Sequence, residues 1–591
     1  MKINEKLESL RNLMGRHNID AYIVPTCDFH GSEYIGDYFK TREFISGFTG
    51  SSGTAVVTME EALLWTDGRY FLQAQEQLKG SEFVLMKSGE PGVLTTKEYL
   101  KNKMNEGNVI GFDGRTMTAS DAEDVSSIKG VVVNSDIDLI GELWKDRPRL
   151  SCRLVWNLSE KYSGEARRQK IGRIREAMLM EEMQVLLVTS LDEIAWTLNL
   201  RGDDVKCNPV FMAFMIITKN ECILFAQKNA FSKEILEQLG KDGVSIKDYD
   251  SVYDNIKVFE NNKIWLDKTT ANFNIVNAIS ETNEIMDKFT PPLQMKAVKN
   301  PVEIENMERA HLLDGVAMTK FIYWLKKKVG KIPMSEVSLG EKLEEFRGMA
   351  KSYLGPSFEP IVGYNDHGAI VHYSATEESD YDIKDEGIVL IDSGGQYMEG
   401  TTDVTRTISL GKITDRMKEM YTAVLRGNLN LAAAVFKKGC TGVSLDYLAR
   451  KPLWEKGLDY NHGTGHGVGY LLNVHESPNA FRYRIMENPQ LNPVLKPGMI
   501  TSDEPGVYLE GEFGIRIENL ILCIEKSSNE YGEFLGFKPL TLIPFDRELV
   551  NRNEMTAEEE KLLDEYHQVV YEKISPYLDD DEKEWLKKEM S

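Results

Sequence analysis

The chain has 591 residues, of which 42% are hydrophobic and 28% charged, and its formal charge at pH 7 is −23. This length exceeds what one hydrophobic core serves and predicts roughly two to four domains. The acidic excess argues against a general nucleic-acid binder, which needs clustered lysine and arginine. Because no apolar run approaches the roughly 18 residues of a membrane span, we expect a cytoplasmic protein without membrane partners.

Two stretches in the N-terminal half repeat one coarse plan of helix, buried strand, polar connection and strand hairpin. The first stretch contains the strand-like runs IDAYIVPT and ALLWTDGRYFLQA, and the second contains MQVLLVTS and VFMAFMIITKNECILFAQ, with LDEIAWTLNL between them. The repeated pattern predicts two related α/β domains.

Prolines and polar residues mark the predicted domain boundaries. Pro148 lies in a charged stretch between the two repeats, and Pro291, Pro292 and Pro301 interrupt regular structure further on. We therefore expect domains over residues 1–155, 156–298 and 299–591. After Pro301, apolar residues at helical spacing predict a long helix that opens the third domain. A charged, helical tail from Thr556 to Met590 is expected to be a surface or subunit-contact element.

Two pairs of acidic residues lie at the ends of apolar, strand-like runs in the C-terminal half. Asp392 closes the run in GIVLIDSGG, and Asp403 follows eleven residues later; Glu504 and Glu518 are fourteen residues apart. Buried carboxylates are costly unless a cation or a proton compensates their charge. A pair of divalent ions would supply that compensation, so the pattern predicts a two-metal hydrolytic centre.

Strand alternation adds neighbours to these acidic residues, because side chains two apart on a strand share a face. Asp403 should share its face with Thr405, and Arg516 should lie beside Glu518. A structural ion pair between Arg516 and Glu518 is the plainer interpretation of that second motif taken alone.

Five of the nine histidines lie between His367 and His475. His466 lies in HGTGHGVG, four residues after His462, and the glycines favour a loop or twisted strand over a helix. His372 in AIVHYS and His475 in NVHESP complete the group. From spacing alone, a packing role and a functional role are equally supported for these histidines. The neighbouring acidic strand ends favour a functional role.

Four carboxylates and one imidazole form an oxygen-rich donor set. Such a set suits Mn²⁺ better than a thiolate-rich zinc site does, and Zn²⁺, Co²⁺ and Fe²⁺ remain alternatives. Two ions about 3.5 Å apart would share a hydroxide and polarise a carbonyl.

Five motifs, IDSGGQY, TTDVTRT, GTGHGVG, DEPGVY and GIRIEN, occur in this order along the C-terminal half. With them the chain resembles the Xaa-Pro aminopeptidases (aminopeptidase P) of the pita-bread metallopeptidase family, in their long, three-domain cytosolic form. The resemblance covers essentially the whole length. It implies two creatinase N-terminal-like α/β domains, followed by a pita-bread catalytic domain, and five metal ligands, which would be Asp392, Asp403, His466, Glu504 and Glu518.

The resemblance also implies roles for single residues. Asp403 and Glu518 would bridge the two metals, and Glu504 would also be the proton shuttle. His372 and His475 would contact the substrate and the intermediate, whereas His462 and Arg516 would line the proline-side pocket. The implied reaction removes the first residue of a peptide whose second residue is proline, and the implied assembly is a homodimer.

Four other functions stand beside this one. An Xaa-Pro dipeptidase (prolidase) has a similar centre, but the three-domain length and the HGTGHGVG context favour the aminopeptidase. Two substantial N-terminal domains disfavour methionine aminopeptidase, and the complete ligand set disfavours creatinase. A non-catalytic peptide-binding relative is disfavoured for the same reason, because a matched site outweighs fold analogy.

Overall fold

The computed structural model describes residues 1–376 and 379–590, and the chain divides into two compact units. Unit 1 comprises residues 1–160 and 165–292, and unit 2 comprises residues 161–164 and 293–591. Each unit is described separately below.

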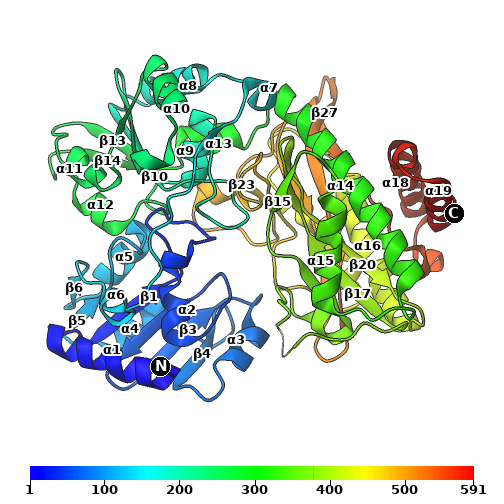
Figure 1. Ribbon diagram of the computed structural model, residues 1–591, viewed down its shortest axis with the longest axis horizontal. Helices are drawn as coiled ribbons and strands as arrows, with labels where there is room; N and C mark the ends of the chain where they lie inside the picture. Colours follow the sequence, from blue (N-terminus) through cyan, green and yellow to red (C-terminus); the bar gives the residue numbers. More distant parts are fainter. Residues whose placement is uncertain (377–378, 591) are drawn as a thin grey trace. The chain divides into compact units, whose positions relative to one another are not determined.

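Unit 1 contains two six-stranded sheets with the same topology (Figure 1). The first has the order β4 (Phe83–Lys87), β3 (Ala62–Thr66), β2 (Thr54–Thr58), β1 (Ala21–Pro25), β5 (Val109–Gly111), β6 (Val132–Asn134). The second has the order β12 (Val244–Lys247), β11 (Cys222–Ala226), β10 (Ala213–Thr218), β8 (Val185–Val188), β13 (Lys263–Leu266), β14 (Glu284–Asp287). In each sheet three central strands are joined by two antiparallel pairings, and the strands on either side of them are added by parallel pairings. The repeated sequence pattern therefore corresponds to a repeated structure.

The helices of unit 1 accompany these sheets. They are α1 (Ile3–His17), α2 (Thr41–Ser46), α3 (Phe71–Gln77), α4 (Thr96–Lys103), α5 (Ala119–Ser126), α6 (Leu139–Leu143), α8 (Arg167–Met180), α9 (Leu191–Leu198), α10 (Lys233–Lys241), α11 (Val252–Ile256) and α12 (Phe273–Asn277). Helix α9 differs from the polar connection that we expected there. Leu191, Ile194 and Leu198 recur at helical spacing and are buried, which explains why the segment is helical.

The described part of unit 2 contains one six-stranded sheet, two three-stranded sheets, one two-stranded sheet and six main helices. One three-stranded sheet has the order β16 (Ile361–Tyr364), β17 (Ile388–Ser393), β20 (Val404–Ser409). The six-stranded sheet has the order β21 (Val435–Lys437), β28 (Gly532–Pro539), β27 (Asn519–Asn529), β24 (Ile500–Asp503), β22 (Gly465–Gly467), β23 (Glu476–Phe481). The other three-stranded sheet is β15 (Tyr353–Pro356) with β18 (Gly395–Tyr397) and β19 (Gly400–Thr401), and the two-stranded sheet is β25 (Gly506–Leu509) with β26 (Phe513–Arg516). The helices are α14 (Pro301–Lys328), α15 (Glu336–Arg347), α16 (Asp415–Ala432), α17 (Val443–Trp454), α18 (Ala557–Ile574) and α19 (Asp580–Glu589).

Helix α14 begins where the sequence predicts a long helix. Asn300 caps it by accepting hydrogen bonds from the backbone N–H groups of Val302 and Glu303, and Pro301 occupies the first turn, where its missing N–H costs nothing. Helices α14 and α15 lie side by side in unit 2 (Figure 1).

Strand β17 is buried on both faces, which explains its continuous apolar run. Val389 and Ile391 pack into a core with α14 and α15 residues, whereas Ile388 packs into a core with residues of α16 and β26. Alternation places Asp392 on the same face as Ile388. The carboxylate at the end of this strand therefore lies inside unit 2, where it is 8% exposed.

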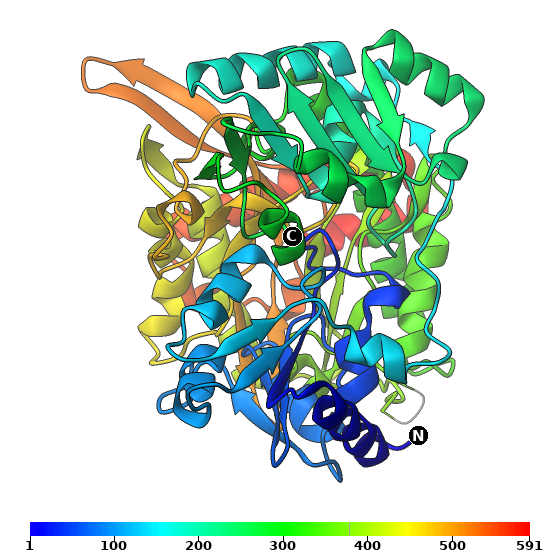
Figure 2. The ribbon, with the colours of Figure 1, turned by 90° about the vertical axis from the view of Figure 1, so that its left-hand side faces the viewer.

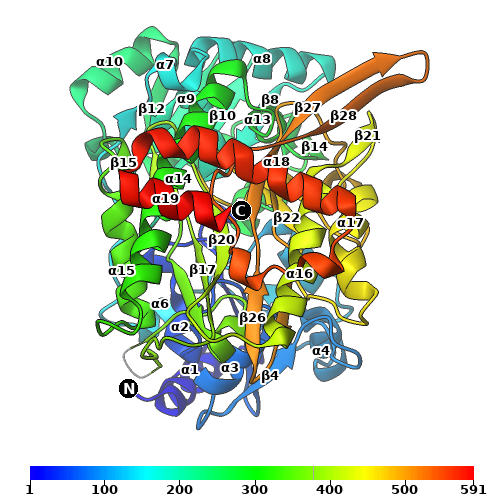
Figure 3. The ribbon, with the colours of Figure 1, turned by 90° about the vertical axis from the view of Figure 1, so that its right-hand side faces the viewer.

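The C-terminal tail forms α18 and α19, as its helical pattern predicts, and both lie on one side of unit 2 (Figure 3). The β27–β28 hairpin extends away from the rest of this unit (Figures 2 and 3). Among the described residues, no helix combines the length and apolar character needed to cross a membrane.

Candidate metal centre

The acidic residues of unit 2 lie at strand ends. Asp392 lies in β17, Asp403 immediately precedes β20, and Glu504 immediately follows β24. Glu518 lies between β26 and β27, and its backbone N–H donates to the carbonyl of Thr405 at 3.1 Å. Strand pairing therefore fixes the backbone positions of the residues that carry these carboxylates.

Four of the five predicted ligands are in direct proximity. His466 Nε2 lies 3.4 Å from Asp403 Oδ2 and 3.5 Å from Glu504 Oε1. One ligand atom from each of Asp403, His466 and Glu518 lies within 4.8 Å of the other two. Asp392 joins this cluster electrostatically, since burial, together with the charge of Asp403, raises its pKa against the opposing charge of Arg516.

Two glycines determine the position of His466. A Cβ at Gly465 would lie 1.8 Å from the carbonyl oxygen of Ser502, and one at Gly467 would lie 2.3 Å from that of Glu476. Only glycine permits β22 to approach both neighbouring strands so closely. The Nδ1 atom of His466 lies 2.8 Å from Gly467 O, so a proton on Nδ1 leaves the Nε2 lone pair facing the carboxylates. His466 lies in a strand, which agrees with the expectation of a loop or twisted strand in place of a helix.

Burial and mutual repulsion alter the pKa values of this cluster. Burial raises the pKa of Glu504 to about 7, against the opposing effects of His466 and Arg516. Burial, together with Asp403, raises the pKa of Glu518 well above its usual range. Burial acts to lower the pKa of His466, but its hydrogen bond with Asp403 and the charge of Glu504 outweigh it and raise the pKa to about 9. Several groups thus share an environment that favours added positive charge.

Arg516 pairs with a different carboxylate from the one that we expected to dominate. Its Nη2 donates to Asp392 Oδ2 at 2.6 Å, and its Nε donates to Thr405 Oγ1 at 3.2 Å. Arg516 also acts on Glu518, where its charge opposes the rise in pKa that burial causes, but its charged hydrogen bond goes to Asp392. Arg516 pairs with Gly506 across the β25–β26 hairpin, and β26 contacts β17, the strand that carries Asp392. This strand arrangement brings the two side chains together.

The three remaining predicted histidines lie on separate segments of unit 2. The rings of His475 and His466 are 4.3 Å apart and meet at 68°. His462 Nε2 lies 2.8 Å from the hydroxyl of Tyr508. His372 follows Val371, whose carbonyl accepts from Arg516 Nη2 at 3.3 Å. Each histidine is therefore linked, directly or through one neighbour, to the predicted ligands or to Arg516.

Sequence reasoning missed Tyr508, which lies between two predicted residues. Its hydroxyl contacts His462 and accepts from Arg516 Nη1 at 2.8 Å. A Cβ at Gly506 would lie 2.6 Å from this hydroxyl, so the glycine leaves room for it. Because Tyr508 and Arg516 are diagonal neighbours across a hairpin, register would have indicated their contact.

Ser502 was also missed, and Thr405 was expected on the face of Asp403 but without a role in orienting Glu518. Ser502 Oγ accepts from the backbone N–H of His466 at 2.9 Å and donates to Glu504 Oε1 at 3.2 Å. Thr405 Oγ1 donates to Glu518 Oε2 at 2.9 Å. Each hydroxyl orients a carboxylate of the cluster, and alternation with Asp403 was the available signal for Thr405.

The donor set fits divalent cations. It consists of carboxylate oxygens and one imidazole nitrogen, which are ligands of Mn²⁺, Zn²⁺ and Co²⁺. Asp392 Oδ1 is buried without a hydrogen-bond partner among the described residues. A cation would satisfy this oxygen and would offset the repulsion that raises the carboxylate pKa values.

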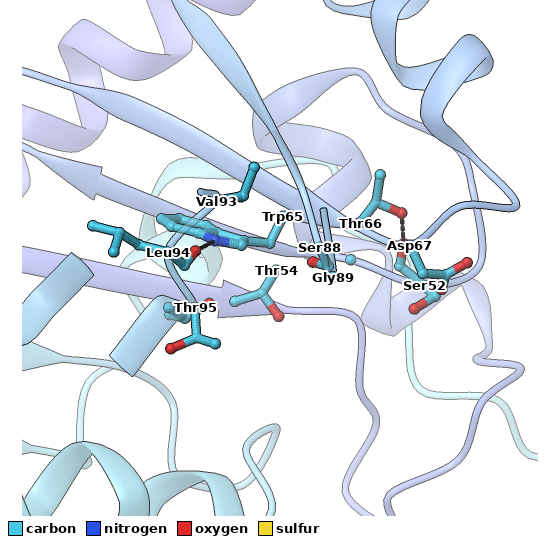
Figure 4. A pocket seen from close by; sticks show the side chains of 12 residues that line it. Ser52, Thr54, Trp65, Thr66, Asp67, Ser88, Gly89, Val93, Leu94 and Thr95 are labelled. Carbon is cyan, nitrogen blue, oxygen red and sulfur yellow. Dashed lines mark hydrogen bonds between the residues drawn. The ribbon is translucent and has the colours of Figure 1, made fainter. Parts of the chain in front are cut away.

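A separate cavity of about 380 Å³ lies in unit 1, beside the ends of β3 and β4 (Figure 4). Its walls include Trp65, Asp67 and Ser88, and Trp65 Nε1 donates to the carbonyl of Leu94 at 2.7 Å. None of the nine predicted site residues lines this cavity, so it is distinct from the acidic cluster of unit 2.

Four family models match consecutive parts of the chain. The creatinase/prolidase N-terminal domain matches residues 6–141 and, in a second model, residues 146–303. Metallopeptidase family M24 matches residues 305–525, and the C-terminal region of peptidase M24 matches residues 533–591. This order confirms the predicted fold class, in which two α/β domains precede a pita-bread catalytic domain.

The chain is similar over its full length to curated proteins and to a solved structure. It is 40% identical to a probable Xaa-Pro aminopeptidase P of Laccaria bicolor, covering 99% of this chain and 93% of that protein. It is 37% identical to Xaa-Pro aminopeptidase 1 of Dictyostelium discoideum, covering 100% and 96%. The crystal structure of X-prolyl aminopeptidase from Caenorhabditis elegans, described as a cytosolic enzyme with a di-nuclear active site, matches with a TM-score of 0.95, 33% identity and full coverage of both chains. The chain therefore belongs to metallopeptidase family M24, among the Xaa-Pro aminopeptidases.

Proposed function

We propose that this protein is a metal-dependent aminopeptidase that removes the first residue from peptides whose second residue is proline. The observation that carries the proposal is the cluster of Asp403, His466, Glu504 and Glu518 in unit 2. Full-length relatives named Xaa-Pro aminopeptidase support the choice of substrate.

Five residues hold the metals in this proposal: Asp392, Asp403, His466, Glu504 and Glu518. Together these residues would hold two divalent ions, and Mn²⁺ is the proposed metal because most donors are carboxylates. When bound, the ions supply an ionised water and polarise the peptide carbonyl.

Glu504 moves the proton in the proposed reaction. It accepts a proton from the attacking water and delivers it to the leaving nitrogen of proline. The hydrogen bond from Ser502 orients one of its oxygens. His475 and His372 donate hydrogen bonds to the substrate carbonyl as negative charge develops on it.

His462 and Arg516 line the pocket for proline. An Xaa-Pro amide has no N–H, so recognition of the second residue depends on the shape of its ring. The contacts of Tyr508 with both residues support this assignment, because one hydroxyl fixes the two side chains together.

The proposal extends to organisation and location. We propose three domains, over residues 1–155, 156–298 and 299–591, a division supported by the two sheets of equal topology in unit 1. We also propose a cytoplasmic homodimer with its contact in the third domain. The description of the Caenorhabditis elegans protein as a cytosolic enzyme supports the location.

A metal-dependence assay with product identification tests the proposal. The protein, freed of metal by chelation and reloaded with Mn²⁺, should release arginine from Arg-Pro-Pro and leave Gly-Pro largely intact. Robust cleavage of Gly-Pro without cleavage of Arg-Pro-Pro would identify a prolidase instead. Failure to bind about two divalent ions, together with no peptidase activity, would identify a non-catalytic relative.

A further inference from the structure

A buried carboxylate lies between two buried lysines directly beside His475. Glu476 begins β23 and accepts a hydrogen bond from Lys296 Nζ at 2.9 Å on one oxygen and from Lys299 Nζ on the other. The side chains of Glu476 and Lys299 are each 1% exposed, and that of Lys296 is 5% exposed. We call these three residues the lysine–glutamate triad.

The two lysines are themselves fixed to the strand that leads to Glu504. Lys299 N–H donates to the carbonyl of Gly498 at 2.9 Å, and Val298 forms an antiparallel bridge with Met499, which precedes β24. Lys299 Nζ also donates to the carbonyl of Lys296 at 3.0 Å. The ammonium groups therefore have little freedom to follow Glu476 if it moves.

The backbone of Glu476 is tied to the candidate metal centre. Glu476 pairs with Gly467 across β22 and β23, and Gly467 follows His466. His475, the residue before Glu476, places its ring against that of His466. Any shift of Glu476 would therefore move His475 relative to the ligand that it contacts.

The energetic cost of the triad makes a purely stabilising role a poor explanation. A buried ion pair often contributes no more than well-packed apolar residues of the same size, because both charges lose their hydration. Here two ammonium groups share one carboxylate, so the second lysine adds a third buried charge. What the arrangement provides is a fixed geometry, since two donors from a rigid segment fix the positions of both carboxylate oxygens of Glu476.

We propose that Glu476, paired with Lys296 and Lys299, is a positioning residue that sets the location of the His475 imidazole in the active site. This inference rests on the proposed role of His475 with the substrate carbonyl. Glu476 itself touches neither substrate nor metal in this account. Its contribution to the reaction passes entirely through His475.

A double-mutant cycle tests this dependence. Glu476→Gln is made in the parent and in the His475→Ala background, and kcat, KM, metal content and Tm are measured on Arg-Pro-Pro with Mn²⁺. In the parent we expect kcat to fall about 10- to 100-fold, as for other residues that orient an active-site group, with KM changing less and about two metals retained. In the His475→Ala background the same substitution should lower kcat less than about threefold, because the group that it positions is gone.

Asp314→Asn is the matched control. Asp314 also pairs with a fully buried cation, Arg347, at 2.7 Å in unit 2, but it makes no contact with His475 in the described structure. This control should lower Tm comparably and leave kcat near that of the parent. If Glu476→Gln does not fold, Lys296→Met, which retains Lys299, takes its place in the cycle with the same expectations.

Two results would overturn the inference. One is an equal loss of kcat in the parent and the His475→Ala backgrounds, and the other is an equal loss of kcat in Glu476→Gln and Asp314→Asn at equal Tm. Either would make the triad a structural ion cluster alone. Failure of the parent to cleave Arg-Pro-Pro is a different result, because it would reject the proposed function itself.

Discussion

Arg516 and Asp392 form a buried ion pair, in which Arg516 Nη2 lies 2.6 Å from Asp392 Oδ2. The same guanidinium also donates hydrogen bonds to the hydroxyls of Thr405 and Tyr508 and to the carbonyl of Val371. Its planar array of donors thus connects a predicted metal ligand to three other segments of unit 2. A substitution that removes the charge of Arg516 and one that removes only its planar array of donors should therefore have different effects.

Glu504→Gln should abolish turnover more completely than Arg516→Lys. The first substitution removes both a metal ligand and the proposed proton carrier, so we expect kcat to fall by more than about 10³-fold. The second keeps the positive charge but cannot bond four partners at once, so a loss of about 10- to 100-fold is expected. Steady-state kinetics on Arg-Pro-Pro, with metal content measured in parallel, compares the two.

Arg552→Lys is a matched control for the arginine substitution. Arg552 pairs with Asp564 at 2.7 Å on an exposed part of unit 2, where shape matters little. It should retain the activity of the parent. Parental activity in Glu504→Gln would contradict the proton-transfer role of this residue.

Metal removal should destabilise the protein more at neutral pH than at acidic pH. Burial raises the pKa of Glu504 from 4.5 to about 7, so the folded, metal-stripped protein binds more protons than the unfolded chain between these values. The contribution of Glu504 to the free energy of unfolding of the metal-stripped protein is fully present below pH 4.5 and decreases as the pH rises to about 7. Bound metal opposes this decrease, and a hundredfold excess over Kd adds about 2.7 kcal/mol per site.

The measurement is Tm by calorimetry, with and without chelator, at several pH values from 5 to about 7.5. The difference in Tm between loaded and stripped protein should widen as the pH rises. A difference that is independent of pH would show that these carboxylates do not take up protons when the metal leaves.

The acidic residues that we propose as metal ligands could be singled out from the sequence because they lie next to strand-forming runs. Asp392, Asp403 and Glu504 all meet this condition, and the glycines around His466 indicate close strand approach. What the local pattern lacked was the pairing between distant strands. Arg516 was expected beside Glu518 on its own strand, whereas its charged hydrogen bond goes to Asp392, 124 residues away.

Other features were missed because their signals depend on tertiary partners. Tyr508 looks like an ordinary strand residue until the β25–β26 register places it beside Arg516. Helix α9 carries a helical spacing of apolar residues, but its length of 8 residues is short for such a pattern to be distinctive. The lysines of the lysine–glutamate triad are 177 or more residues from Glu476, so no local motif links them.

Glu336→Gln should loosen the segment that carries His372. The buried carboxylate of Glu336 accepts from the backbone N–H groups of Tyr364 at 2.8 Å and Tyr381 at 3.1 Å, and from the hydroxyl of Tyr373 at 2.9 Å. An amide presents N–H groups to some of these donors. We therefore expect a loss of stability of about 2 kcal/mol and a fall in kcat/KM of about tenfold.

Hydrogen exchange and kinetics together test this expectation. Tyr364 and Tyr381 donate to different oxygens of Glu336, so amide exchange should accelerate at the one of the two that faces the new amide nitrogen. Glu341→Gln is the control, since Glu341 lies on the same helix but is exposed, and it should match the parent. Unchanged exchange and unchanged kcat/KM in Glu336→Gln would mean that other contacts hold the segment.

His567→Gln should reduce the sensitivity of the protein to acid. Burial, together with Arg406, lowers the pKa of His567 to about 4, and its Nε2 accepts from the backbone N–H of Phe545 at 3.2 Å. The unfolded chain, with the ordinary value of 6.5, binds more protons between pH 6.5 and 4, so stability is complete above 6.5 and decreases toward 4. The free energy of unfolding that this group loses over that range is about 3 kcal/mol.

Glutamine retains an acceptor for Phe545 without titrating. The fall in Tm between pH 7 and about 4.5 should therefore be smaller in the variant than in the parent, and an equal fall in both proteins would assign acid sensitivity to other groups.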